Sequence, residues 1–148
     1  MSSTPISTIL DSFLEQGIKL SPIGATMLGI PGMDDQLDDL SMQGNDKRAE
    51  LTRKTLAAIK AETPVNEFDR IARDVAVERL TSELNLNDTF EARILFNLIS
   101  SPVTSIRQVF EMMKKDQGDT IANVTKRLDA IEAAFKGWKS TQIGRAHV

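Results

Sequence analysis

The sequence predicts an all-α protein of about five or six helices. Its apolar residues recur every three or four positions along most of the 148-residue chain, which is the spacing of amphipathic helices. Aromatic residues make up only 5% of the chain and tyrosine is absent, so aliphatic side chains must build the core. Ser21-Pro22 and Ser101-Pro102 each combine an N-cap residue with proline at the first helical position. Each of these steps therefore predicts the start of a helix.

The first predicted helix is ended by Gly17 and then by Ser21-Pro22. Its apolar face carries Ile6, Ile9, Leu10, Phe13 and Leu14. A second, short helix should begin at Pro22. The run Gly29-Ile-Pro-Gly32 stops it, and residues 33–40 are expected to form a loop.

Two longer helices should follow this loop. Ser41 is a suitable cap for a helix that ends at about Glu62, although Gly44 and Asn45 weaken its first turn. Its inward residues are expected to be Leu51, Thr55, Leu56 and Ile59. Pro64 breaks the chain before a helix over about residues 66–84. The apolar face of that helix carries Phe68, Ile71, Ala72, Val75 and Ala76, with Leu80 and Leu84 on a slightly rotated stripe.

The segment 85–100 has no clear period, and its apolar run at 94–96 fits either a helix or a buried extended segment. From Ser101-Pro102 a helix should run to about Lys115. Its inward residues are expected to be Val103, Ile106, Val109, Phe110 and Met113.

The last helix has the clearest pattern. Gly118 breaks the chain, Asp119 is its predicted cap, and apolar residues then alternate at spacings of three and four. These residues are Ile121, Val124, Leu128, Ile131, Phe135 and Trp138. Such a seam must lie against another helix, and its short length favours a neighbour within the same fold. The basic pair Lys126-Arg127 is expected on the solvated side of this helix.

Composition limits what the protein can bind. The net charge of −3 argues against nucleic acid, which needs a clustered basic surface. The absence of cysteine excludes disulfides and cysteine-ligated zinc. The start of the chain has no secretory signal pattern, and no run approaches the roughly 20 apolar residues that span a bilayer. We therefore expect a cytoplasmic protein that binds neither nucleic acid nor membranes.

The final residues, 143–148, differ in character from the rest. Their sequence, IGRAHV, matches one reading frame of a widely used sequencing adapter. We therefore expect an N-terminal helical region over residues 1–142, an adapter-derived tail after it, and a natural chain that continues beyond Gln142. His147, the single histidine, lies in this tail. Without it the chain has no imidazole for a zinc site or a histidine general base, so we expect no catalytic residue and no cofactor here.

One acidic cluster is a candidate metal-binding site. Asp34, Asp35, Asp38 and Asp39 contain the D-D-x-x-D pattern that holds magnesium and diphosphate in helical prenyl-transferring enzymes. That chemistry needs the carboxylates on one helix face, whereas this cluster follows Gly-Ile-Pro-Gly and should lie in a loop. It also lacks the central glycine and final glutamate of a calcium loop. A solvated loop that caps the next helix is the favoured interpretation, and the four aspartates are the candidate metal ligands.

Two stretches resemble a known family. PIGATMLGIPGMDDQLDDLS (residues 22–41) and NLISSPVTSIRQVF (residues 97–110) are similar to segments of the bacterial domain-of-unknown-function family 885, and the helix with Arg127-Leu128 fits a third. The resemblance implies a much longer, mostly helical, metallopeptidase-like protein with a His-Glu helix motif far towards its C-terminus. Zinc held there would serve peptide or amide hydrolysis. No residue of this chain matches that motif.

Three hypotheses follow for the function. The chain is an N-terminal helical fragment of a zinc-dependent peptidase-like hydrolase, inactive alone, whose partner is the missing C-terminal part of the same protein. Alternatively, it is a self-contained helical interaction module with the last helix as its partner groove. The third hypothesis is a magnesium- and diphosphate-binding enzyme that uses the aspartate cluster.

Overall fold

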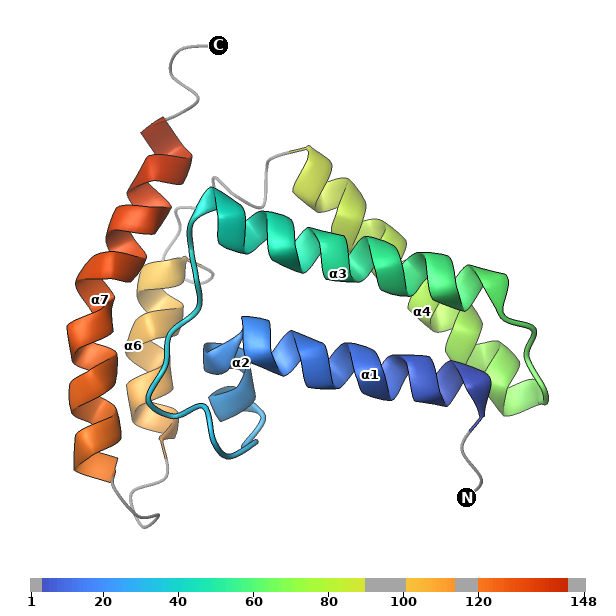
Figure 1. The fold of residues 1–148 in the computed structure, drawn as a ribbon, viewed down its shortest axis with the longest axis horizontal. Coiled ribbons are helices and arrows are strands. Elements are labelled where there is room, and N and C mark those ends of the chain that lie inside the picture. Colours follow the sequence, from blue (N-terminus) through green and yellow to red (C-terminus); the bar gives the residue numbers. More distant parts are fainter. Residues whose placement is uncertain (1–3, 90–100, 114–119, 144–148) are drawn as a thin grey trace. The chain divides into compact units, whose positions relative to one another are not determined.

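The computed structural model describes residues 4–89, 101–113 and 120–143. These residues form six helices and no strand, which confirms the all-α prediction. The helices are α1 (Pro5–Leu20), α2 (Pro22–Met27), α3 (Met42–Ala61), α4 (Glu67–Asp88), α6 (Pro102–Met112) and α7 (Thr120–Ile143) (Figure 1). Among these helices, none is long and apolar enough to cross a membrane.

The chain divides into two compact units. Unit 1 comprises residues 1–17 and 46–92, and unit 2 comprises residues 18–45 and 93–148. Most of α1, most of α3 and all of α4 belong to unit 1. Unit 2 contains α2, the loop that follows it, α6 and α7.

The core of unit 1 is aliphatic. Ile6 of α1, Ile59 of α3, and Ala76 and Leu80 of α4 are buried together. Most of the predicted inward residues of α1 and α3 pack around them, but Leu14 is exposed. The helix α1 also continues through Gly17 to Leu20, so this glycine does not end it as predicted.

Asp69 fixes the start of two helices in unit 1. It is buried, its backbone N–H donates to the N-cap side chain of Asn66 at 2.8 Å, and its carboxylate accepts from the backbone N–H of Val65 at 3.1 Å. The same carboxylate accepts a hydrogen bond from the hydroxyl of Thr4. Thr4 in turn exchanges backbone-to-hydroxyl hydrogen bonds with Ser7, a capping arrangement at the start of α1. A buried carboxylate thus links the first turns of α1 and α4.

The predicted apolar face of α4 is not the face that the core uses. Phe68, Ile71 and Val75 are 72%, 50% and 56% exposed, while Asp69, Ala76 and Leu80 are buried. Successive residues of an α-helix are turned by about 100°, so the buried face is rotated by roughly that angle from the apolar stripe. The prediction that this stripe faces inward is therefore wrong for its three large side chains.

Unit 2 is built on contacts of α2 with α6 and of both with α7. Its buried core residues are Ile23 of α2, Ile106 and Val109 of α6, and Ala134 of α7. Ile131 and Phe135 of α7 pack against this cluster, so the apolar seam does lie against helices of the same fold. Trp138 is partly buried, with its ring centroid 6.2 Å from that of Phe135. On α6, Val103 is exposed although an inward position was predicted.

The helix starts in unit 2 follow the predicted cap residues, with one difference. The hydroxyl of Ser101 accepts from the backbone N–H of Thr104 at 3.3 Å, and Ser41 similarly caps α3. Ser21 occupies the N-cap position of α2, but its side chain makes no capping hydrogen bond. The predicted cap at Asp119 and the ambiguous run at 94–96 lie outside the described residues.

The end of α2 is a Schellman motif. Gly29 has a φ of +73°, the backbone N–H of Ile30 donates to the carbonyl of Ala25 at 2.9 Å, and that of Gly29 donates to the carbonyl of Thr26 at 3.0 Å. This geometry ends α2 where the sequence predicts and turns the chain into the loop that carries the four aspartates.

Candidate functional site

The side chain of Arg127 is buried in unit 2. The prediction that it is solvated is wrong: its residue exposure is 0%, and it is the largest fully buried side chain among the described residues. It lies on the same line of α7 as Ala134 and Thr141, which are also buried and follow at intervals of seven residues. The core-facing line of α7 therefore passes through Arg127, Ala134 and Thr141, and only part of the predicted apolar seam, Ile131 and Phe135, packs beside it.

The guanidinium of Arg127 holds the aspartate-bearing loop. Its Nε donates to the carbonyl of Gln36 at 2.9 Å, and its Nη2 donates to the carbonyl of Met33 at 3.0 Å. Nη2 also donates to the hydroxyl of Thr26 at 2.6 Å. Because carbonyls in an irregular loop lack ladder partners, a buried five-donor fork is well suited to satisfy them. Arg127 thereby joins α7 to the loop and to α2.

Burial lowers the pKa of the Arg127 guanidinium, since desolvation disfavours its charged form. The negative charges of Asp34, Asp35 and Asp38 act in the opposite direction and favour the cation. The Nη1 atom is buried and has no hydrogen-bond partner among the residues that the structure describes. Arg127 is thus a desolvated cation in an acidic surrounding.

Asp38 and Asp39 have local structural contacts. The carboxylate of Asp38 accepts from the hydroxyl of Ser21 and from the backbone N–H of Ile23, both at 2.9 Å. Asp38 therefore caps the N-terminus of α2, the role that the sequence assigned to Ser21. Asp39 accepts from the backbone N–H of Ser41 at 3.0 Å and shapes the turn before α3.

Asp34 and Asp35 contact α2 and α7. Asp34 accepts from the hydroxyl of Thr26 at 2.9 Å. Asp35 lies 3.1 Å from the Nζ of Lys126, and the hydrogen bond from this lysine is the main cause of a lowered pKa at Asp35. The four aspartates are thus placed in a loop, as expected, and each has a separate partner. Within the described residues, no group of three or more acidic or histidine side chains could hold a metal ion.

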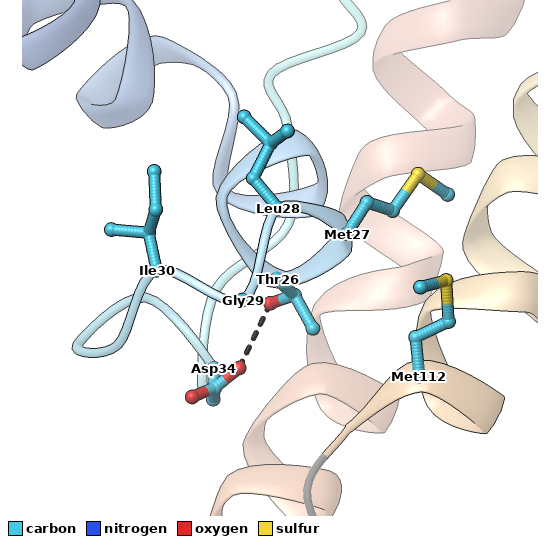
Figure 2. Close-up of a pocket in the computed structure, with 7 residues that line it drawn as sticks. All are labelled: Thr26, Met27, Leu28, Gly29, Ile30, Asp34 and Met112. Atoms are coloured by element: carbon cyan, nitrogen blue, oxygen red, sulfur yellow. Dashed lines mark hydrogen bonds between the residues drawn. The ribbon is translucent and has the colours of Figure 1, made fainter.

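A pocket of about 300 Å³ opens beside this network (Figure 2). It is formed by the end of α2, the turn that follows, and the last turn of α6. Its lining residues are Thr26, Met27, Leu28, Gly29, Ile30, Asp34 and Met112. The linked side chains of Thr26 and Asp34 supply its polar part, and methionine and branched aliphatic side chains supply the rest.

Sequence reasoning missed the two residues that organise this region, Arg127 and Thr26. A signal was available for Arg127, because residues 127, 134 and 141 are spaced by whole heptads beside small residues at 130 and 137. No local pattern distinguishes Thr26, whose role depends on Asp34 in the following loop and on Arg127, which is 101 positions away.

The fold and site define an all-helical protein whose loop and helices are joined by a buried arginine. Residues 22–147 match the model of a family described as bacterial protein of unknown function (DUF885), and the chain belongs to that family. The match contains the whole aspartate loop and Arg127. No curated protein matches the chain.

Proposed function

We propose that this chain is the N-terminal helical part of a larger family 885 protein, and that the full-length protein is a zinc-dependent, peptidase-like hydrolase. In this proposal the chain supplies no catalytic residue. It forms one wall of the folded enzyme, and its partner is the C-terminal part of the same protein. Family membership and the resemblance of the two signature segments support the class of protein.

The observation that carries the structural part of the proposal is the uncovered edge of α7. Ile121 and Leu128 belong to its apolar seam, yet they are 85% and 53% exposed. The core of unit 2 uses the line through Arg127 together with Ile131 and Phe135 of the seam, and the described residues leave Ile121 and Leu128 uncovered. Large apolar side chains repeated along one helix line are typical of a surface that another element covers. We assign this edge to the C-terminal part.

The first test is the sequence downstream of the codon for Gln142, followed by expression of the longer protein. We expect it to contain a His-Glu helix motif, to bind zinc and to hydrolyse peptide or related amide bonds. An open reading frame that stops soon after this codon would refute the proposal.

The second test compares Leu128→Ser in the longer protein and in the 148-residue chain. Completing the burial of a half-exposed leucine contributes about 1 kcal/mol, so the variant should destabilise the longer protein by that much more than the short chain. Asp129→Ser, at the neighbouring exposed position, is the matched control and should have little effect in either protein. Equal effects of Leu128→Ser in both proteins would exclude this edge as the docking surface.

The self-contained interaction module remains the competing hypothesis, because an exposed apolar edge also suits a separate partner. It predicts that the 148-residue chain is monodisperse and unfolds in one sharp, reversible transition. The proposal predicts that the same chain folds but self-associates through the uncovered edge of α7 as its concentration rises, with a less cooperative transition.

A further inference from the structure

We propose that the pocket between α2 and α6 binds a small amphiphilic amine, with the ammonium group at Asp34 and the apolar part against the methionine-lined wall. The volume of about 300 Å³ lies at the lower end of the range for small-ligand sites. Such sites combine apolar surface with a few fixed polar groups, and this pocket contains both kinds of surface. This binding would be a property of the chain itself and does not depend on the proposed hydrolase.

The walls of the pocket are held in place before any ligand arrives. The Schellman motif fixes the backbone of Gly29 and Ile30 through two hydrogen bonds to α2. Thr26 is oriented by its hydrogen bonds with Arg127 and Asp34. A preorganised polar group loses little conformational freedom on binding, so its contacts contribute more to affinity.

The charge of this region favours a cation. Asp34, Asp35 and Asp38 face two cations, Arg127 and Lys126, which leaves one negative charge in excess. Asp35 is paired with Lys126, while Asp34 interacts with the charge of Arg127 but forms no direct ion pair within the described residues. One oxygen of Asp34 accepts from Thr26, and a carboxylate can accept about four hydrogen bonds in all. It can therefore receive an ammonium group, and it would repel an anion.

The apolar part of the pocket selects the rest of the ligand. Met27 and Met112 extend from α2 and α6, and Ile30 lies on the turn that follows α2 (Figure 2). Methionine side chains adapt to ligands of different shape, so the pocket should accept branched or linear aliphatic groups. A short aliphatic chain that bears one ammonium group matches both parts of the site.

Titration of the 148-residue chain with leucine amide tests this proposal, with nuclear magnetic resonance shifts as the readout. N-acetyl-leucine amide is the matched probe, because it keeps the isobutyl group and loses the ammonium charge. We expect leucine amide to bind at least tenfold more tightly than the acetylated probe, with shifts centred on residues 26–34. Equal affinities, or no saturable shift with either probe, would overturn the proposal.

Two variants locate the ammonium contact. Asp34→Asn keeps an oxygen that can accept from Thr26, and it should weaken the binding of leucine amide about tenfold while leaving the acetylated probe unchanged. Asp35→Asn makes the same change of charge one residue away and should have a much smaller effect. If Asp34→Asn and Asp35→Asn weakened the binding of leucine amide equally, the ammonium group would be attracted by the summed negative charge of the loop. That result would overturn the assignment of the contact to Asp34. Met112→Ala, at an exposed position that does not endanger the fold, should weaken both probes.

Discussion

Replacing Arg127 by methionine should destabilise unit 2 strongly. The variant removes hydrogen bonds to the carbonyls of Gln36 and Met33 and to the hydroxyl of Thr26. Hydrogen bonds to charged groups contribute about 1.5–3 kcal/mol each but are not additive, and disrupting a buried charged network costs about 3–5 kcal/mol. Methionine keeps an apolar stem and removes the desolvation penalty of the guanidinium. We therefore expect a net loss of about 3 kcal/mol in the free energy of unfolding.

Urea and thermal unfolding, followed by the fluorescence of Trp138, measure this loss. Trp138 is the single tryptophan and belongs to unit 2, so its signal reports the affected unit. If the 148-residue chain unfolds as a whole, a loss of about 3 kcal/mol in its free energy of unfolding corresponds to a Tm lowered by roughly 6–12 °C. Far-ultraviolet circular dichroism records the helices of both units in the same samples.

Lys126→Met is the matched control. It removes the same charge from the adjacent residue of α7, but the Lys126 side chain is 63% exposed and has one surface ion pair, to Asp35. Its cost should be below about 1 kcal/mol. Arg127→Lys keeps the charge and loses the planar fork, and we expect an intermediate cost of about 2 kcal/mol. The reasoning is refuted if Arg127→Met is no more destabilising than Lys126→Met.

Four further predictions concern single positions. Gly17→Ala should raise the free energy of unfolding, measured by thermal unfolding, by about 0.5–1 kcal/mol, because Gly17 lies inside a helix with open space at its Cβ position. Gly44→Ala should lower the Tm by several degrees, because the added Cβ would overlap the backbone carbonyl of Asp39. Asp69→Ala should cost about 1–3 kcal/mol in urea unfolding, because it leaves two partly buried donors, the hydroxyl of Thr4 and the backbone N–H of Val65, without their acceptor. The pKa of Asp35 is lowered in the folded protein, so its stabilising contribution is present above its unfolded pKa and is lost as the pH falls through the folded value. Asp35→Asn should therefore reduce the pH dependence of the free energy of unfolding below pH 3.8.

Each of these predictions has an opposing result. A destabilised Gly17→Ala or a neutral Gly44→Ala would show that the local backbone differs from that described. For the buried carboxylate, Asp74→Ala is the control, because Asp74 is exposed and its loss should change the free energy of unfolding by less than about 0.5 kcal/mol. An unchanged pH profile in Asp35→Asn would exclude its ion pair as a source of stability.

The positions of the helices could be predicted from the sequence because their signals are local. Ser41, Asn66 and Ser101 cap helices through backbone groups three residues ahead, and glycine or proline follows where helices end. The loop position of the aspartates was likewise predictable from the Gly-Ile-Pro-Gly run before them. These interactions need no information from the rest of the chain.

The buried face of each helix could not be predicted in the same way. Apolar periodicity marks side chains that favour burial but not the element that covers them, so Phe68 of α4 and Ile121 of α7 were assigned inward although both are exposed. In α4 the core uses a face rotated from the apolar stripe, and in α7 it uses only part of the stripe, Ile131 and Phe135, beside the line through Arg127. The sequence therefore indicates more apolar surface than the described residues cover.

The candidate site depended on the tertiary structure. From the sequence alone, Arg127 is an ordinary basic residue beside Lys126, and Asp38 is one of four aspartates in a loop. Arg127 is buried because its acceptors include carbonyls 91 and 94 positions away, and Asp38 caps a helix that begins 16 residues before it. Local sequence thus determined where the helices and the acidic loop lie. Only long-range contacts decided which charges are buried, because a guanidinium is stable inside a protein only where the fold brings enough acceptors to it.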